Sequence, residues 1–205
     1  MTKRIVSVDI GLKGGISIFL IDEGSKAELI NVESMPIKKI EVKPAKYVLD
    51  LKNGKKQYYK TGPNKGEVKK KLSSSAKYKE ELDLFTIKSI FSSSSIDVET
   101  TIVFESPGTS FGNAAGATAT TNRNFGKLLA IAELSKSNIV EVPAHLWKKD
   151  LSLTKDKLQC VDYAEKLFNK SFKTKNGALI DGEAESALIG HWYITKKLGE
   201  DYGYL

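Results

Sequence analysis

The alternation of apolar and polar residues along the first part of the chain predicts three consecutive strands. Residues 4–10 (RIVSVDI) alternate in this way, and after a GLKGG turn a second strand is predicted at 16–22 (ISIFLID) and a third at 27–36. Two short apolar runs, at 100–106 (TTIVFES) and 138–143 (NIVEVP), predict two further strands. The sheet therefore begins as a β-meander.

Helical periodicity accounts for most of the remaining apolar residues. It predicts helices at 79–91, 122–136, 144–151, 154–169 and 181–194, with Thr154 as the N-cap of the fourth. Residues 106–121 are mostly small or turn-forming and predict a long loop, which directly after a strand is more often functional than idle. This order of elements predicts an α/β fold, a mixed five-stranded sheet flanked by helices.

Bulk composition narrows the class of protein. A length of 205 residues with 40% hydrophobic residues is typical of a single globular domain, so we expect one domain over 1–205. One cysteine excludes an internal disulfide framework and favours a reducing compartment. No secretion signal or membrane-spanning run is apparent, and we expect a cytoplasmic protein that does not bind membranes.

Positive charge is concentrated in one segment. Residues 38–79 contain fourteen lysines and three acids, a net charge of +11, whereas the whole chain has +7 and the rest of it therefore −4. Lysines interleaved with tyrosines are typical of a phosphate-binding surface, although a solvated, partly disordered insert has the same composition. Asn53-Gly54 predicts a hairpin that pairs Val48 with Tyr59 and Leu49 with Tyr58, and 61–75 reads as a flexible loop. Such a ribbon could lie against DNA or extend the sheet.

Carboxylates occur where buried elements begin or end. Asp9 lies near the end of the first strand, Glu105 near the end of the fourth, and Asp181 and Glu185 share the apolar face of the last helix. Asp9 and the helix pair have ordinary alternatives, a turn cap for Asp9 and an exposed helix start for the pair. If the two strands are neighbours and the helix docks across their ends, the four acids converge. Such a set, without His or Cys, favours Mg²⁺ or Mn²⁺, and two ions about 4 Å apart would support phosphodiester hydrolysis.

Several motifs, in order, resemble the Holliday junction resolvases of the RuvC family, in particular its small phage-encoded branch. They are VDIGLKGGISIF, SMP, IVFESP, a Gly-rich loop leading to NFGKLLA, VPAHLWKK, TKDK and DGEAESALIGHW, which together extend from Arg4 to about Thr195 outside the basic insert. The resemblance implies an RNase H-like fold, a homodimer, and Mg²⁺-dependent paired nicks placed symmetrically across a four-way DNA junction. Mn²⁺ is expected to substitute for Mg²⁺, and a phage origin would place the protein in a bacterial host's cytoplasm.

The resemblance also assigns the acidic residues. Asp9 matches the first-strand Asp of the family, Glu105 the Glu of the fourth strand, and Glu185 the last acid, which is Asp in bacterial members. Bacterial members place the two helix acids three residues apart; here residue 182 is Gly, so the third acid is assigned to Asp181, four before Glu185. Glu183 is expected at the surface.

Candidate DNA contacts follow from the same motifs and from the insert. Phe111 corresponds to an aromatic that stacks at the junction, or else anchors its own loop. Basic candidates are Arg123, Lys148 and Lys155 in the motifs and Lys55 and Lys56 in the insert, against solvated side chains as the alternative. For the dimer contact we expect the helix at 122–136, with Leu128, Leu129, Ile131 and Ala132.

Other functions compete with a junction resolvase. A broader branched-DNA or flap endonuclease would use the same acids, and a non-catalytic junction-binding protein would not need them. The DIGLKGG segment also resembles the phosphate loop of actin-like ATPases, but those need two such lobes and this chain has room for one. No nucleotide cofactor is expected.

Overall fold

The computed structural model describes residues 2–22, 26–44, 46–49, 51–52, 55–61, 63–92, 99–108 and 115–199. The chain divides into two compact units, the first formed by Met1–Pro36 with Leu82–Leu205 and the second by Ile37–Glu81. The basic insert predicted at 38–79 lies within the second unit.

A mixed five-stranded sheet forms the centre of the first unit, as predicted. Its strand order is β11-β10-β1-β2-β3; β1, β2 and β3 are antiparallel neighbours, while β10 runs parallel to β1 and β11 parallel to β10. The strand bounds are β1 Lys3–Asp9, β2 Gly15–Ile21, β3 Glu28–Ser34, β10 Glu99–Ser106 and β11 Asn138–Pro143.

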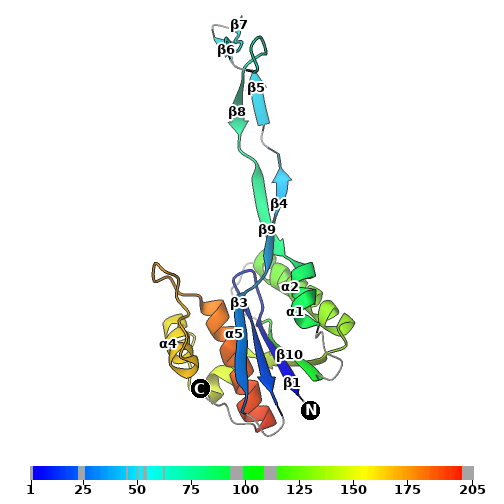
Figure 1. Ribbon diagram of the computed structural model, residues 1–205, viewed down its shortest axis with the longest axis vertical. Coiled ribbons are helices and arrows are strands. Elements are labelled where there is room, and N and C mark those ends of the chain that lie inside the picture. Colours follow the sequence, from blue (N-terminus) through cyan, green and yellow to red (C-terminus); the bar gives the residue numbers. More distant parts are fainter. Residues whose placement is uncertain are drawn as a thin grey trace. The chain divides into compact units, whose positions relative to one another are not determined.

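Helices cover both faces of this sheet (Figure 1). The bounds are α1 Leu84–Phe91, α2 Ala115–Leu134, α3 Ala144–Asp150, α4 Lys157–Phe168 and α5 Asp181–Trp192, and α5 continues as a π-helix over Tyr193–Leu198. Because strand side chains alternate, Ile5 packs with α4 and α5 on one face, whereas Val6 and Val8 pack with α1 and α2 on the other. The buried side chains of these strands therefore contribute to two separate cores.

Three predicted helix starts were wrong. The helix expected from 79 begins at Leu84, after the strand β9 (Lys77–Leu82), because the Asp83 carboxylate caps it by accepting from the Thr86 backbone N–H (3.4 Å). The helix expected from 122 begins at Ala115, since short Ala and Thr side chains permit a helix without contributing to a core. The helix expected from 154 is capped by Asp156 and begins at Lys157.

The second unit consists of two-stranded pairs alone within its described residues. The pairs are β4 Ile37–Lys43 with β9 Lys77–Leu82, β5 Lys46–Leu49 with β8 Lys70–Ser74, and β6 Leu51–Lys52 with β7 Lys55–Lys56. We call this unit the ribbon. Lys52 pairs with Lys55, in the predicted register, but Asn53 and Gly54 lie outside the described residues.

Two predictions for the ribbon were wrong. Val48 and Leu49 pair with Lys71 and Lys70 rather than with Tyr59 and Tyr58, and β8 replaces the last part of the loop expected at 61–75. The sequences of β5 (KYVL) and β8 (KKLSS) have little apolar alternation, so the sequence does not specify which segments pair.

The expected dimer surface is also wrong in part. Leu128 and Ala132 are fully buried and Ile131 is 8% exposed, all within the core between α2 and the sheet, so these side chains are not free for a second subunit. Among the described helices, none is long and apolar enough to cross a membrane.

Candidate metal centre

Parallel pairing of β1 and β10 brings two acids to one edge of the sheet. Val8 is the partner of Phe104 in this register, so Asp9 and Glu105 follow at matching positions where both strands end. Their side chains point to the face covered by α5, because Asp9 alternates with Val8, and Glu105 with Phe104, both of the opposite core. The predicted convergence of these two strand-end acids is therefore confirmed.

Close backbone contact brings the start of α5 to the same edge. Gly182 forms a bridge with Gly14 in the turn after β1, and a Cβ at residue 182 would lie 2.2 Å from the carbonyl oxygen of Lys13. Only glycine fits there. No side chain, acidic or otherwise, is therefore tolerated at residue 182 unless the backbone shifts.

Buried serines fix α5 against the sheet one turn further on. The Ser7 hydroxyl donates to the carbonyl of Ser186 (2.7 Å), and the hydroxyls of Ser17 and Ser186 are 2.7 Å apart. All three serines are fully buried. These bonds determine the register of α5 and so the position of Glu185, which neighbours Ser186.

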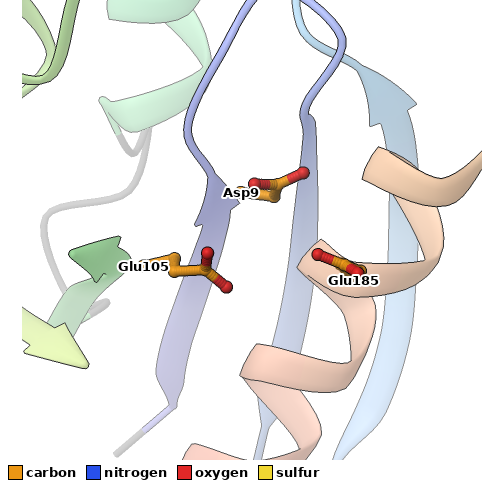
Figure 2. Close-up of side chains that lie close together, drawn as sticks. All are labelled: Asp9, Glu105 and Glu185. Carbon is orange, nitrogen blue, oxygen red and sulfur yellow. The ribbon is translucent and has the colours of Figure 1, made fainter. Parts of the chain in front are cut away.

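Asp9, Glu105 and Glu185 form what we call the acidic cluster (Figure 2). One carboxylate oxygen from each lies within 4.8 Å of those from the other two, and all three residues are partly buried. They come from β1, β10 and α5, so the cluster exists only in the folded chain.

The cluster is electrostatically strained. Burial, and then the charges of Glu105 and Glu185, hold the pKa of Asp9 well above its ordinary value. Burial also raises the pKa of Glu105, an effect opposed by a hydrogen bond from Trp147. Three like charges this close require a cation or protons to be stable.

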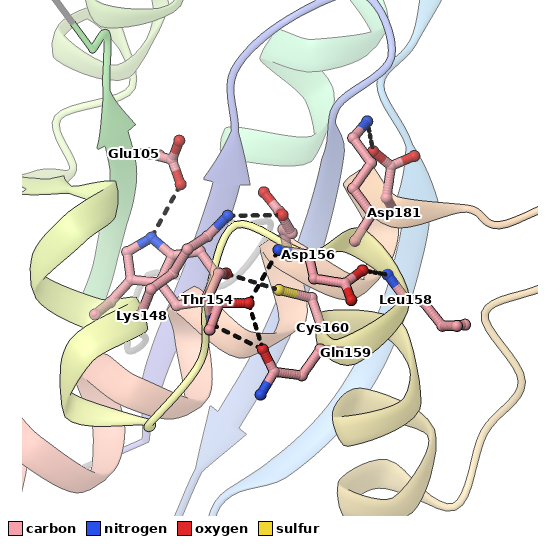
Figure 3. A network of polar contacts seen from close by, with 11 residues as sticks. Glu105, Lys148, Thr154, Asp156, Leu158, Gln159, Cys160 and Asp181 are labelled. Carbon is pink, nitrogen blue, oxygen red and sulfur yellow. Dashed lines mark hydrogen bonds and ion pairs between the residues drawn. The ribbon is translucent and has the colours of Figure 1, made fainter.

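Lys148 supplies one positive charge from within the site. Its ammonium group donates to Glu185 Oε1 (2.8 Å), with the two side chains only 15% and 13% exposed (Figure 3). Burial lowers the pKa of Lys148, but the hydrogen bond and charge of Glu185 outweigh it and raise the pKa above its ordinary value. If all are ionised, three carboxylates and one ammonium group leave a net charge of −2.

Asp181 lies beside the cluster rather than in it. Its carboxylate is ion-paired with Lys157 at the start of α4 (Figure 3). It nevertheless lines the same pocket of about 580 Å³ as Asp9 and Glu185, and its charge contributes to the raised pKa of Asp9. Glu183 accepts a hydrogen bond from Ser34 (2.7 Å) away from the cluster.

The other predicted contacts are dispersed. Arg123 is exposed on α2, and Lys155 lines a second pocket of about 680 Å³ together with Lys148. Lys55 and Lys56 are exposed in the ribbon, and Phe111 lies outside the described residues.

Sequence reasoning missed Trp147 and Asn124. The Trp147 indole donates to Glu105 Oε2 (2.9 Å), and Asn124 of α2, 8% exposed, lines the pocket above the acids. From sequence alone, a tryptophan that donates a hydrogen bond to a site residue cannot be told from one that only packs in the core. The one available signal for Trp147 was its place in the WKK segment.

The donor set fits a hard divalent cation. Carboxylate oxygens are the ligands that Mg²⁺ and Mn²⁺ prefer, and the excess negative charge provides the attraction. Asp9, Glu105 and Glu185 are the residues that would hold such an ion.

Comparisons with known proteins give structural likeness only. No protein-family model and no curated protein matches the chain. Several solved structures are similar, and two of them, both of low identity, are RuvC structures. RuvC from Thermus thermophilus in complex with a Holliday junction substrate has 11% identity and a TM-score of 0.49 over 95% of this chain and 96% of that one. A further T. thermophilus RuvC structure has 9% identity and a TM-score of 0.42 over 96% and 97%.

Proposed function

We propose that the protein is a metal-dependent endonuclease that resolves four-way DNA junctions by paired, symmetric phosphodiester hydrolysis. The observation that carries this proposal is the acidic cluster, three carboxylates from three elements within 4.8 Å, open to a pocket with lysines around it. Such a site has little use in a protein that only binds DNA, because the acids repel phosphates.

The residues in and beside the acidic cluster have different proposed roles. Asp9, Glu105 and Glu185 would hold divalent cations, which when bound activate a water molecule and stabilise charge on the leaving oxygen. Lys148 neutralises part of the carboxylate charge and remains cationic beside an incoming phosphate. Asp181 remains a candidate fourth ligand, since it lines the same pocket.

A basic path beside the cluster suits a DNA strand. The second pocket is lined by Ser106, which follows Glu105 in the chain, and by His145, Lys148, Lys149 and Lys155. We propose that phosphates next to the scissile bond lie there. Arg123 and Phe111 stay predicted contacts of the same strand.

The ribbon is proposed to bind a duplex arm. A two-stranded ribbon fits the major groove of DNA, and it is too thin to form a core of its own. Most of its lysines are accessible to phosphates. Among the described residues, the exposed ones are Lys38, Lys39, Lys43, Lys52, Lys55, Lys56, Lys60, Lys65, Lys70, Lys77 and Lys79, of which Lys79 is ion-paired with Glu81.

Symmetric resolution requires two cluster-bearing subunits related by a two-fold axis, so we propose a homodimer on the junction. Sedimentation in the presence of junction DNA tests this. A species containing one protein chain would contradict paired cutting.

A comparison of four labelled DNA substrates distinguishes the candidate functions. Cleavage of a four-way junction, a three-way fork, a flap and a linear duplex is measured in Mg²⁺ and in Mn²⁺. We expect paired nicks in the four-way junction at the highest rate. Faster flap cutting would favour the flap endonuclease, and tight junction binding without cleavage in either metal would favour the non-catalytic binder.

A further inference from the structure

Two consecutive residues of the short helix α3 donate hydrogen bonds to two different acids of the acidic cluster. Trp147 donates its indole N–H to Glu105 Oε2 (2.9 Å), and Lys148 donates to Glu185 Oε1 (2.8 Å). Glu105 belongs to β10 and Glu185 to α5, so α3 connects two acids that no strand pairing joins directly (Figure 3).

The far end of α3 is anchored by a second bond of the same chemistry. Trp192 of α5 donates its indole N–H to Asp150 Oδ2 (2.8 Å). Trp147 is fully buried and Trp192 is 2% exposed, so both indoles are held by packing and both donate to a carboxylate. The two acceptors differ: Glu105 is partly buried and belongs to the cluster, whereas Asp150 is exposed and lies outside it.

The bond from Trp147 has a specific consequence for Glu105. The terminal torsion of a glutamate is broad, so an unsupported carboxylate rotates freely between many orientations. A rigid, buried donor to one carboxylate oxygen fixes this torsion, so the second oxygen is held in a single orientation. Lys148, whose ammonium lies 4.9 Å from the centre of the Trp147 ring, is held by the same side chain.

We propose that Trp147 is a positioning residue for metal binding, its indole N–H holding the Glu105 carboxylate in the orientation that a divalent cation requires. The inference rests on the proposed metal site. Groups that orient a ligand in this way typically change metal affinity by about 10–100-fold when they are removed.

The test compares two matched substitutions in the full-length protein. Trp147→Phe keeps an aromatic ring and removes the donor to Glu105, whereas Trp192→Phe removes the equivalent donor to Asp150. Mn²⁺ affinity is measured without DNA, from the EPR signal of free Mn²⁺. We expect Trp147→Phe to weaken Mn²⁺ binding roughly tenfold or more, and Trp192→Phe to change it by less than about threefold.

A second variant separates the hydrogen bond from packing. Replacing Trp147 by 3-benzothienylalanine preserves the shape of the indole and substitutes sulfur for the N–H; we expect the same loss of Mn²⁺ affinity with a wild-type circular dichroism spectrum. Because the chain has two tryptophans, Trp192→Phe leaves Trp147 as the sole tryptophan. Its emission, excited at a wavelength that tyrosine does not absorb, should respond to Mn²⁺ with the affinity seen by EPR.

The outcomes distinguish this inference from the proposed function. Absence of Mn²⁺ binding by the wild type would overturn both. Wild-type affinity in the benzothienylalanine protein would overturn the role of Trp147 alone, as would an equal loss in the Trp147→Phe and Trp192→Phe variants.

Discussion

Asp9→Asn is expected to make the metal-free protein more stable while abolishing its response to Mg²⁺. Asp9 shares a cluster with Glu105 and Glu185 in which the nearest oxygens are within 4.8 Å. Two unit charges at that separation repel by about 3.5 kcal/mol at an effective dielectric constant of about 20. Asn removes this charge with little change of shape.

The expected size of the effect is smaller than the two repulsions together. The positive charge of Lys148 offsets part of this repulsion. Protonation of Asp9, which its raised pKa favours, removes the rest. We therefore expect a gain of about 1–2 kcal/mol in the free energy of unfolding, or about 2–8 °C in Tm for a chain of this size.

The sign of the pH dependence follows from the same pKa. Because the pKa of Asp9 is raised in the folded state, the folded protein retains a proton that the unfolded chain has released. Stability of the metal-free wild type therefore falls as pH rises from the ordinary carboxyl range, about 4, through the raised value. The advantage of Asp9→Asn should grow over that range.

Thermal unfolding followed by circular dichroism, in EDTA and in Mg²⁺, measures both effects. For the wild type, free Mg²⁺ at about ten times its Kd should add about 1.4 kcal/mol, and for Asp9→Asn almost nothing. Glu141→Gln, a charge removed from an exposed position on β11, is the control. The reasoning is refuted if Asp9→Asn melts below the wild type in EDTA, or gains as much from Mg²⁺.

Other regions of the chain give three further predictions. Gly182→Ala should cost about 1–3 kcal/mol of stability and lower Mn²⁺ affinity, because its methyl group would collide with the Lys13 carbonyl; wild-type values in both melting and binding would show that the turn can move. Replacing Lys55 and Lys56 by Gln should weaken junction binding and reduce the slope of log K against log salt by about 1–2. Replacing the same two lysines by Arg keeps the charge and is the control. An unchanged slope in the Gln variant would show that Lys55 and Lys56 do not contact DNA. Burial lowers the pKa of His191 to about 4, so the folded state disfavours its protonation and about 3 kcal/mol of stability should be lost as pH falls from 6.5 to 4; NMR titration of His191 near 6.5 would contradict this.

The central sheet was predictable because its signal is local. Strict alternation identified the β-meander, and acids at the ends of two apolar strands pointed to one edge of the sheet. The position of Glu185 followed from the helical face it shares with Leu188 and Trp192. These features depend on periodicity and chain order, which a sequence states directly.

What the sequence did not reveal depends on contacts between distant segments. The glycine at 182 reads as a weak helix residue until Gly14 is seen against it. Trp147 reads as core until its indole is seen on Glu105. The pairing of β5 with β8 joins strands whose sequences, KYVL and KKLSS, have no regular apolar alternation to specify a register.

Cleavage of a labelled four-way junction by the wild type and by Glu185→Gln tests the central claim most directly. Glu185 is the acid that α5 brings to the two strands, and the variant removes its charge while keeping its shape. Under single-turnover conditions in Mg²⁺, we predict paired symmetric nicks by the wild type and none by the variant, which should bind the junction at least as tightly. Cleavage by Glu185→Gln at the wild-type rate would contradict the assignment of the acidic cluster as the catalytic site.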